Sequence, residues 1–246
     1  MELRDVFAHV SVQEPLQWGR LQVFPLLQPN GHQPTYTLID ELLESGEAEI
    51  TELGEGAAVP TIKVLNQADV DALILDGTEL RGAKQNRMVN VTVIIAKHSE
   101  APIPVSCVEQ GRWAYRDRYF RSAKRTVASR LRNRKAHMVN EHLAAEHRAA
   151  THQGEVWEKV EEYVKGTGTS SRTGALDDAF TARQRDIDAF VERLKQIDAY
   201  GAVVAVNGEI IALDLVDDRK TSRALWESLL RGYAMDAAGK TPKLSG

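Results

Sequence analysis

The sequence predicts an α+β fold, a single domain in which a mainly antiparallel sheet packs against several helices and a C-terminal β-hairpin is followed by a helix. Three observations carry this prediction. Runs rich in Val and Ile, bounded by Gly, Pro, Asn or Asp, are typical of strands. Asn207-Gly208 lies between two apolar runs, which is a strong hairpin signal. The apolar residues of segment 175–199 fall close to one helical stripe.

The first third of the chain predicts short strands and one short helix. We expect strands at 21–28, 34–37 and 48–53, and a helix at 38–44 that Gly46 ends. The turn residues Pro29, Asn30 and Gly31 separate the first two strands.

The middle of the chain is rich in predicted strands, which we place at 61–65, 72–76, 88–96 and 103–109. In 89–95 every odd position is Val or Ile, so one face of that strand is expected to be buried. Asp76-Gly77 predicts a tight hairpin turn. Helices are then expected at 135–150, 156–165, 175–199 and, after the hairpin of 202–215, at 221–235.

Length and composition predict one domain. The 246 residues contain no internal repeat and no long linker, so the domain is expected to span 1–246, with a core of about 15–238 and a frayed C-terminal tail. No apolar run approaches the roughly 18 residues that cross a membrane, and the first residues have no signal-peptide pattern. One cysteine cannot form an internal disulfide, so we expect a cytoplasmic protein without membrane contact.

Positive charge is concentrated in segment 112–135, which contains ten basic residues and one acid, while the chain as a whole has a net charge of −4. Such a block is typical of a protein with an anionic partner, including nucleic acid. Two alternatives remain: the cations pair with acids elsewhere in the fold, or the segment forms a dimer or partner surface. A homo-oligomer is therefore possible.

Several strong signatures are missing from the sequence. It has no dinucleotide or phosphate-loop glycine motif, no HExxH and no CxxC pair, so the cofactor stays unknown. Four histidines recur every five residues from His137, and on a helix they cannot share one face. Only His142 and Glu146 have a spacing suited to joint ligation, and an exposed polar helix is the favoured explanation of the histidines. We assign no metal ligand.

The densest polar stretch is 76–87, between two apolar strands. Glu79, Lys84, Gln85, Asn86 and Arg87 lie there, and its two glycines permit tight turns. Amides and cations gathered in a loop can orient a sugar, a phosphate or an amide. An ordinary hydrophilic hairpin loop is the alternative.

Cys107 lies on a predicted strand together with Ile103 and Val105, facing the same way. A cysteine among apolar neighbours behaves as a small inert hydrophobe, and no histidine that could activate it is near in sequence. The end of the strand is more suggestive, because Glu109 is followed by Arg112 and Trp113. These residues offer a carboxylate, a guanidinium and a flat apolar wall.

The loop 165–174 precedes a predicted helix and contains Ser171 and Thr173. Hydroxyl side chains cap helices, and helix N-termini also bind phosphates. The loop therefore predicts either a helix cap or a phosphate cradle.

Two of these stretches carry a resemblance to a known family. E-L-x-G-A-K-Q-N-R at 79–87 and P-V-S-C-V-E-x-G-R-W at 104–113 resemble the core of the ADP-ribosylglycohydrolase- and rhodanese-phosphatase-associated protein domain family. The S-x-T at 171–173, the hairpin at 203–210 and W-x-x-L-L-x-x-Y-x-x-D-A at 226–237 are similar too. The family is named for gene neighbourhoods, which implies ADP-ribose, NAD-derived or related nucleotide metabolites.

Two functional hypotheses follow. In the first, the protein is a hydrolytic enzyme for such a phosphorylated ligand, and Glu79 and Glu109 divide the acid and base roles. Its remaining site residues would bind phosphate, ribose or base: Lys84, Gln85, Asn86, Arg87, Arg112, Trp113, Ser171 and Thr173. A divalent metal is possible between two carboxylates but not required. In the second, the protein is a non-catalytic nucleotide-binding or nucleic-acid-binding module, and segment 112–135 extends the contact.

Overall fold

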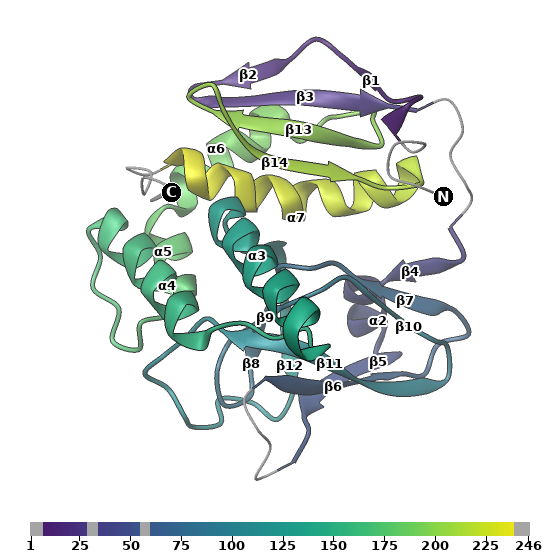
Figure 1. Cartoon of the computed structure of the whole chain (residues 1–246), viewed down its shortest axis with the longest axis vertical. Helices are drawn as coiled ribbons and strands as arrows, with labels where there is room; N and C mark the ends of the chain where they lie inside the picture. The colour runs from purple at the N-terminus through teal and green to yellow at the C-terminus, as the bar shows by residue number, and fades with distance from the viewer. Residues whose placement is uncertain (1–6, 29–33, 55–59, 239–246) are drawn as a thin grey trace.

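The computed structural model describes residues 7–28, 34–54 and 60–238. It confirms the α+β class: helices pack against three mainly antiparallel sheets, and a C-terminal hairpin is followed by a helix (Figure 1). The predicted turn at Pro29, Asn30 and Gly31 lies outside the described residues, as does the tail after residue 238.

The first sheet joins the two ends of the chain. Its central strands are β3 (Leu21–Leu27) and β13 (Gly201–Val206), with β1 (Ser11–Val12) and β2 (Leu16–Trp18) on β3, and β14 (Glu209–Leu215) on β13. The predicted hairpin is confirmed, because Asn207 and Gly208 make its turn with φ of 54° and 80°.

Helix α7 (Arg219–Ala238) runs beneath this sheet in Figure 1 and separates it from the rest of the molecule. A Cβ at Gly232 would lie 2.4 Å from the Thr126 hydroxyl, so only glycine allows the helix to approach β12 (Phe120–Thr126) this closely. Beside it, Trp226 donates a hydrogen bond to the Leu194 carbonyl at the end of α6 (Gln184–Leu194).

A three-stranded sheet lies below, in the order β10 (Val93–Ile95), β7 (Asp71–Ile74), β4 (Tyr36–Leu38), in which β4 and β7 are parallel. Helix α2 (Ile39–Ser45) follows β4 directly. It ends at Gly46, as predicted, in the left-handed conformation with φ 77°.

The third sheet has six strands and curls so that its edges meet. Its order is β12, β8 (Thr78–Gly82), β9 (Arg87–Val89), β11 (Ser99–Cys107), β6 (Thr61–Asn66), β5 (Ala48–Glu52). An isolated bridge between Thr51 and Tyr119 links the first strand to the last. Apolar side chains of alternate residues, such as Ile50, Ile62 and Val105, fill the concave side.

The strand predicted at 88–96 is two strands, β9 and β10, in different sheets. Asn90 breaks it because its polar groups are used by three other segments. Its side chain donates to the Ala149 carbonyl and accepts from Ser106, and its carbonyl accepts from Lys135. The tight turn at Asp76-Gly77 exists, but β7 and β8 on either side of it lie in different sheets, so it closes no hairpin.

The helix predicted at 175–199 is also two elements, α5 (Leu176–Ala182) and α6. Arg183 separates them with φ −107° and ψ 9°. Because the apolar stripe continues through the bend, periodicity alone could not locate the break. Helix α4 (Gln153–Thr167) extends the helix predicted at 156–165 at both ends, whereas α3 (Ser129–Glu146) begins and ends earlier than the helix predicted at 135–150.

A network of buried charges connects α3 to the strands. Arg132 bridges Asp76 and Asp214 with Nη2–Oδ1 distances of 2.8 Å and 2.6 Å. Lys135 donates to Asp76, and Tyr233 donates to Asp214. Burial acts to raise the pKa of Asp76, but the two neighbouring cations outweigh it and lower that pKa to about 2.

Asp236 occupies a second buried network, where it accepts hydrogen bonds from the Tyr163 hydroxyl at 2.6 Å and the Arg130 amide at 3.2 Å. Burial raises its pKa to about 6 in spite of these donors.

No helix within the described residues combines the length and apolar character needed to span a bilayer.

We predict that Asp236→Asn removes a pH dependence of stability. Since the folded pKa of about 6 exceeds the ordinary 3.8, Asp236 favours folding most at low pH, and this stabilisation is lost as pH rises through 6. The stability of wild type relative to the variant should fall by about 2 kcal/mol between pH 4 and pH 6.5. Urea unfolding at each pH measures it, with the exposed Glu141→Gln as control, and a constant difference contradicts the assignment.

Candidate functional site

The predicted polar stretch forms the loop between β8 and β9, and glycine geometry sets its shape. Gly82 has φ 124°, and a Cβ there would lie 2.4 Å from the Tyr119 carbonyl oxygen. Ala83 follows with φ 39°. The loop therefore projects Lys84, Gln85 and Asn86 toward the segment that follows β11.

Glu109 stands at the centre of this region with both carboxylate oxygens occupied. Arg112 approaches it with two donors, Nε at 2.9 Å from Oε1 and Nη2 at 2.7 Å from Oε2. The backbone amide of Asn86 donates to Oε2 at 3.1 Å, and the Thr173 hydroxyl donates to Oε1 at 3.0 Å. Burial acts to raise the pKa of Glu109, but these hydrogen bonds outweigh it and hold the pKa below its usual range.

Arg112 connects the same carboxylate to two loops. Its Nη1 donates to the carbonyls of Ala83 at 2.6 Å and Ala114 at 2.9 Å. Its Nη2 donates to the Gly82 carbonyl and to the Asn86 side chain, both at 3.2 Å. The guanidinium is thus committed to internal acceptors, so the predicted role in holding phosphate is not supported by its contacts.

The loop before α5 docks against this ion pair. The Gly111 amide donates to the Thr173 carbonyl at 2.7 Å, and a Cβ at Gly111 would lie 3.0 Å from Thr173 Cα. The Ser171 hydroxyl accepts from the Ala175 amide and donates to Asp178. Ser171 therefore orders the residue that precedes α5, but no side chain caps the first turn of this helix, so these contacts support neither the helix cap nor the phosphate cradle.

Arg87 lies fully buried on the concave side of the curled sheet. It donates to Gln85 at 3.0 Å and to the Cys107 sulfur, and its Nη2 lies 3.5 Å from Glu52 Oε1. Its Nε has no hydrogen-bond partner. Burial raises the pKa of the Cys107 thiol to about 11, although Arg87 opposes the rise. The burial of Cys107 agrees with the prediction of a small inert residue on the apolar face of the strand. Its contact with the Arg87 guanidinium was not predicted.

Two half-exposed aromatic rings lie near the loop between β8 and β9, and the centroid of one of them, Trp113, is 6.0 Å from Arg87 Cζ. Trp113 is 55% exposed and Tyr115 is 54% exposed. The Lys84 ammonium lies 5.4 Å from the Trp113 ring centroid and 5.2 Å from that of Tyr115. Arg116 is exposed and makes no ion pair with the described residues, and its amide donates to the Ala83 carbonyl beside the loop. We call Lys84, Trp113, Tyr115 and Arg116 the aromatic–basic surface.

Glu79 belongs to a different network. It is completely buried, and its Oε2 accepts from Arg125 Nε at 2.9 Å and Nη2 at 2.8 Å, while Oε1 has no partner. Burial raises the pKa of Glu79, and Asp177 adds to the rise. Asp177 itself pairs with Arg125 and Arg81. Glu79 and Glu109 share no partner, so the geometry does not support an acid–base pair made of these two.

Two rings of the histidine run lie against each other. Among the described residues, no three His, Cys, Asp or Glu side chains are grouped as metal ligands would be. His142 instead lies against His152, with 4.5 Å between ring centroids.

Sequence reasoning did not identify Glu52, and it included Tyr115 and Arg116 only as members of the basic segment 112–135. Glu52 is distant in sequence, and only strand pairing brings it to Arg87. Tyr115 carried a usable signal, because aromatic residues two apart within a basic segment are typical of a stacking surface.

The comparisons with known proteins identify a family and nothing more specific. The sequence model described as ARG and Rhodanese-Phosphatase-superfamily-associated Protein domain matches residues 9–245. No curated protein and no solved structure matches the chain.

We predict that Glu109→Gln destabilises the fold by about 3 kcal/mol, because it leaves Arg112 buried without its counter-charge. Urea unfolding at pH 7 measures the loss. The control is Glu100→Gln, which breaks the exposed pair with Lys63 and should cost less than about 1 kcal/mol. Since the folded pKa of Glu109 is low, the loss should shrink as pH falls below 4.5. Equal effects of the two variants would contradict the role of Glu109.

We also predict that Cys107 resists thiol reagents while the protein is folded. A pKa near 11 in place of 9.0 lowers the thiolate fraction at pH 8 about a hundredfold, and burial blocks access. When a chromogenic disulfide reagent is added, the absorbance of the thiolate that it releases on reaction with Cys107 should not rise until denaturant is added. Prompt stoichiometric release from the native protein would show that the thiol is accessible.

Proposed function

The chain belongs to the ARG and Rhodanese-Phosphatase-superfamily-associated Protein domain family, and we propose that it is a binding module for a phosphorylated nucleotide-type ligand at the aromatic–basic surface. One observation carries the proposal. Two half-exposed rings, Trp113 and Tyr115, flank the Lys84 ammonium on one side of a single loop. A base can stack on such rings, and cations beside them can hold a phosphate.

Contacts around the predicted catalytic carboxylates favour binding over hydrolysis. Glu109 accepts four hydrogen bonds from the protein itself, so it has no free acceptor for a proton or a water. Glu79 is buried beside Arg125. The hydrolytic hypothesis therefore rests on Glu79 alone, through its unpartnered oxygen Oε1.

The positive charge that a ligand could reach is confined to a few side chains at the rim of the aromatic–basic surface. Arg112 and Arg87 are engaged with internal partners, whereas Arg116 is exposed and makes no ion pair with the described residues, so the phosphate would be held by Arg116 at the rim, beside the Lys84 ammonium. This arrangement suits a ligand with one or two phosphates better than a long polyanion, which would need a continuous row of cations.

We predict that Trp113→Ala or Tyr115→Ala weakens nucleotide binding about tenfold or more, since stacking of a base contributes about 1–3 kcal/mol. Calorimetry or thermal shift with ADP, ADP-ribose, NAD and ribose 5-phosphate measures the effect. Trp18→Ala is the matched control, because Trp18 is also exposed and lies beneath a cation, Arg193. Arg116→Ala should weaken binding of phosphorylated ligands, and the exposed Arg185→Ala should not.

The same samples distinguish the alternatives. A short RNA that binds with a steep loss of affinity in salt would favour the nucleic-acid hypothesis. Turnover of any ligand that Glu79→Gln abolishes would favour the enzyme. Unchanged affinities in both aromatic variants would overturn the proposed site.

A further inference from the structure

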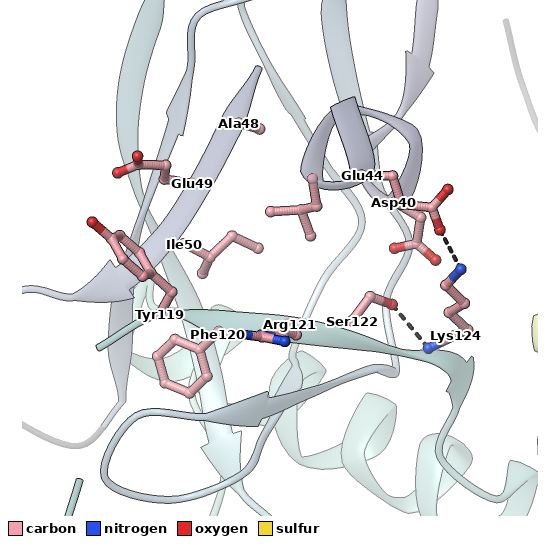
Figure 2. Close-up of a pocket in the computed structure, with 11 residues that line it drawn as sticks. Asp40, Glu44, Ala48, Glu49, Ile50, Tyr119, Phe120, Arg121, Ser122 and Lys124 are labelled. Carbon is pink, nitrogen blue, oxygen red and sulfur yellow. Dashed lines mark hydrogen bonds and ion pairs between the residues drawn. The ribbon is translucent and has the colours of Figure 1, made fainter. Parts of the chain in front are cut away.

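The edge strands β5 and β12 of the curled sheet meet at one end and separate at the other. The bridge between Thr51 and Tyr119 joins them. Beyond it, residues 48–50 and 119–122 line a cavity of about 500 Å³, whose far side is formed by α2 (Figure 2). A cavity of this size accommodates a small ligand or a few residues of an extended chain. We call this opening the seam.

The seam is open because β12 bends. The pairing of β12 with β8 shifts register between Ser122 and Thr126, and Lys124 within that interval has φ 53°. A bulge of this kind turns a strand away from its neighbour. Lys124 then pairs with Glu44 of α2, which holds the bent strand toward the helix.

Both sides of the seam offer backbone groups for pairing. Within the described ranges, β5 has one ladder partner, β6, and β12 has one, β8, apart from the single bridge. Alternate N–H and C=O groups along residues 48–50 and 120–122 therefore face the cavity side of each strand. Such edges are templates for an added strand.

The side chains of the seam alternate in the way that a strand in it would require. Ala48, Ile50 and Phe120 are buried, whereas Glu49 is exposed. Figure 2 shows Ala48 and Ile50 on the side of β5 that faces α2, and Glu49 on the other side. A strand with apolar residues at every second position would match both sides.

The charged side chains that line the seam indicate which residues the other positions of an added strand would carry. Two cations of the lining are neutralised: Arg121 pairs with Asp117, and Lys124 pairs with Glu44. One acid is not. Glu49 is exposed and makes no ion pair with the described residues, so a basic side chain beside it would be favourable. Asp40 is already compensated in part: burial raises its pKa, while the Ser122 hydroxyl and the nearby Lys124 oppose the rise.

From these contacts we propose that the seam binds an extended peptide segment whose side chains alternate between apolar and basic. Its apolar side chains would pack toward Leu43 and Ile50, and its basic side chains would meet Glu49 on the opposite side of the added strand. Because β5 and β12 are antiparallel to each other, the added strand would be parallel to one and antiparallel to the other. The seam shares no residue with the aromatic–basic surface, so the two proposals stand independently.

The test uses the full chain and labelled eight-residue peptides with blocked ends. One alternates Val and Lys, one has the same residues in two blocks, and one is the alternating peptide with N-methylated backbone amides. Fluorescence anisotropy should show binding of the alternating peptide at least tenfold tighter than of the other two. Hydrogen exchange should show new protection of backbone amides in 48–50 and 120–122.

Glu49→Lys should weaken the alternating peptide about tenfold, because it reverses an exposed charge of the seam without touching the core. Glu141→Lys, which makes the same charge change on the exposed side of α3, should leave binding unchanged. Equal affinity for alternating and block peptides overturns the proposal. Binding without protection of the two edge segments overturns it as well, and so does equal weakening by both variants.

Discussion

The relative position of the sheets depends on the two ion pairs of the Arg132 guanidinium. The guanidinium joins Asp76, at the turn between the three-stranded and the six-stranded sheets, to Asp214 of the hairpin at the other end of the molecule. Removing any one of these charges would leave the others buried without compensation, which costs more than the pair contributes. The turn must also leave room, since a Cβ at Gly77 would lie 2.8 Å from Arg132 Cδ. The direction in which β8 leaves the turn is thereby set.

The same logic accounts for the basic segment. Of its ten cations, eight form ion pairs: Arg112, Arg121, Lys124, Arg125, Arg130, Arg132, Arg134 and Lys135. The acids they use come mostly from distant parts of the chain, so a charge block that is prominent in the sequence is largely neutralised in the fold. This favours internal pairing over a surface for nucleic acid. Arg116 and Arg118 are exposed outside those pairs, close in sequence to the rings of Trp113 and Tyr115.

Elements with strong local signals could be predicted from the sequence, and elements decided by distant partners could not. The hairpin at Asn207-Gly208 and the end of α2 at Gly46 follow from backbone preferences of single residues. The breaks at Asn90 and Arg183 interrupt patterns that remain regular through them, because the cause is tertiary. In the site, the motif residues around Glu109 do come together, yet which carboxylate keeps a free oxygen depends on donors from loops far along the chain.

That distinction limits what a carboxylate can do. Each oxygen of Glu109 already accepts two donors, so it could exchange a proton only if the loops carrying Asn86 and Thr173 moved away. Its low pKa has the same origin, because every donor favours the ionised form. Glu79 has the opposite balance: one oxygen is paired, one is not, and burial raises its pKa. Two glutamates that look equivalent in the sequence therefore differ in chemistry, since an occupied carboxylate holds structure while a half-occupied one retains the capacity to react.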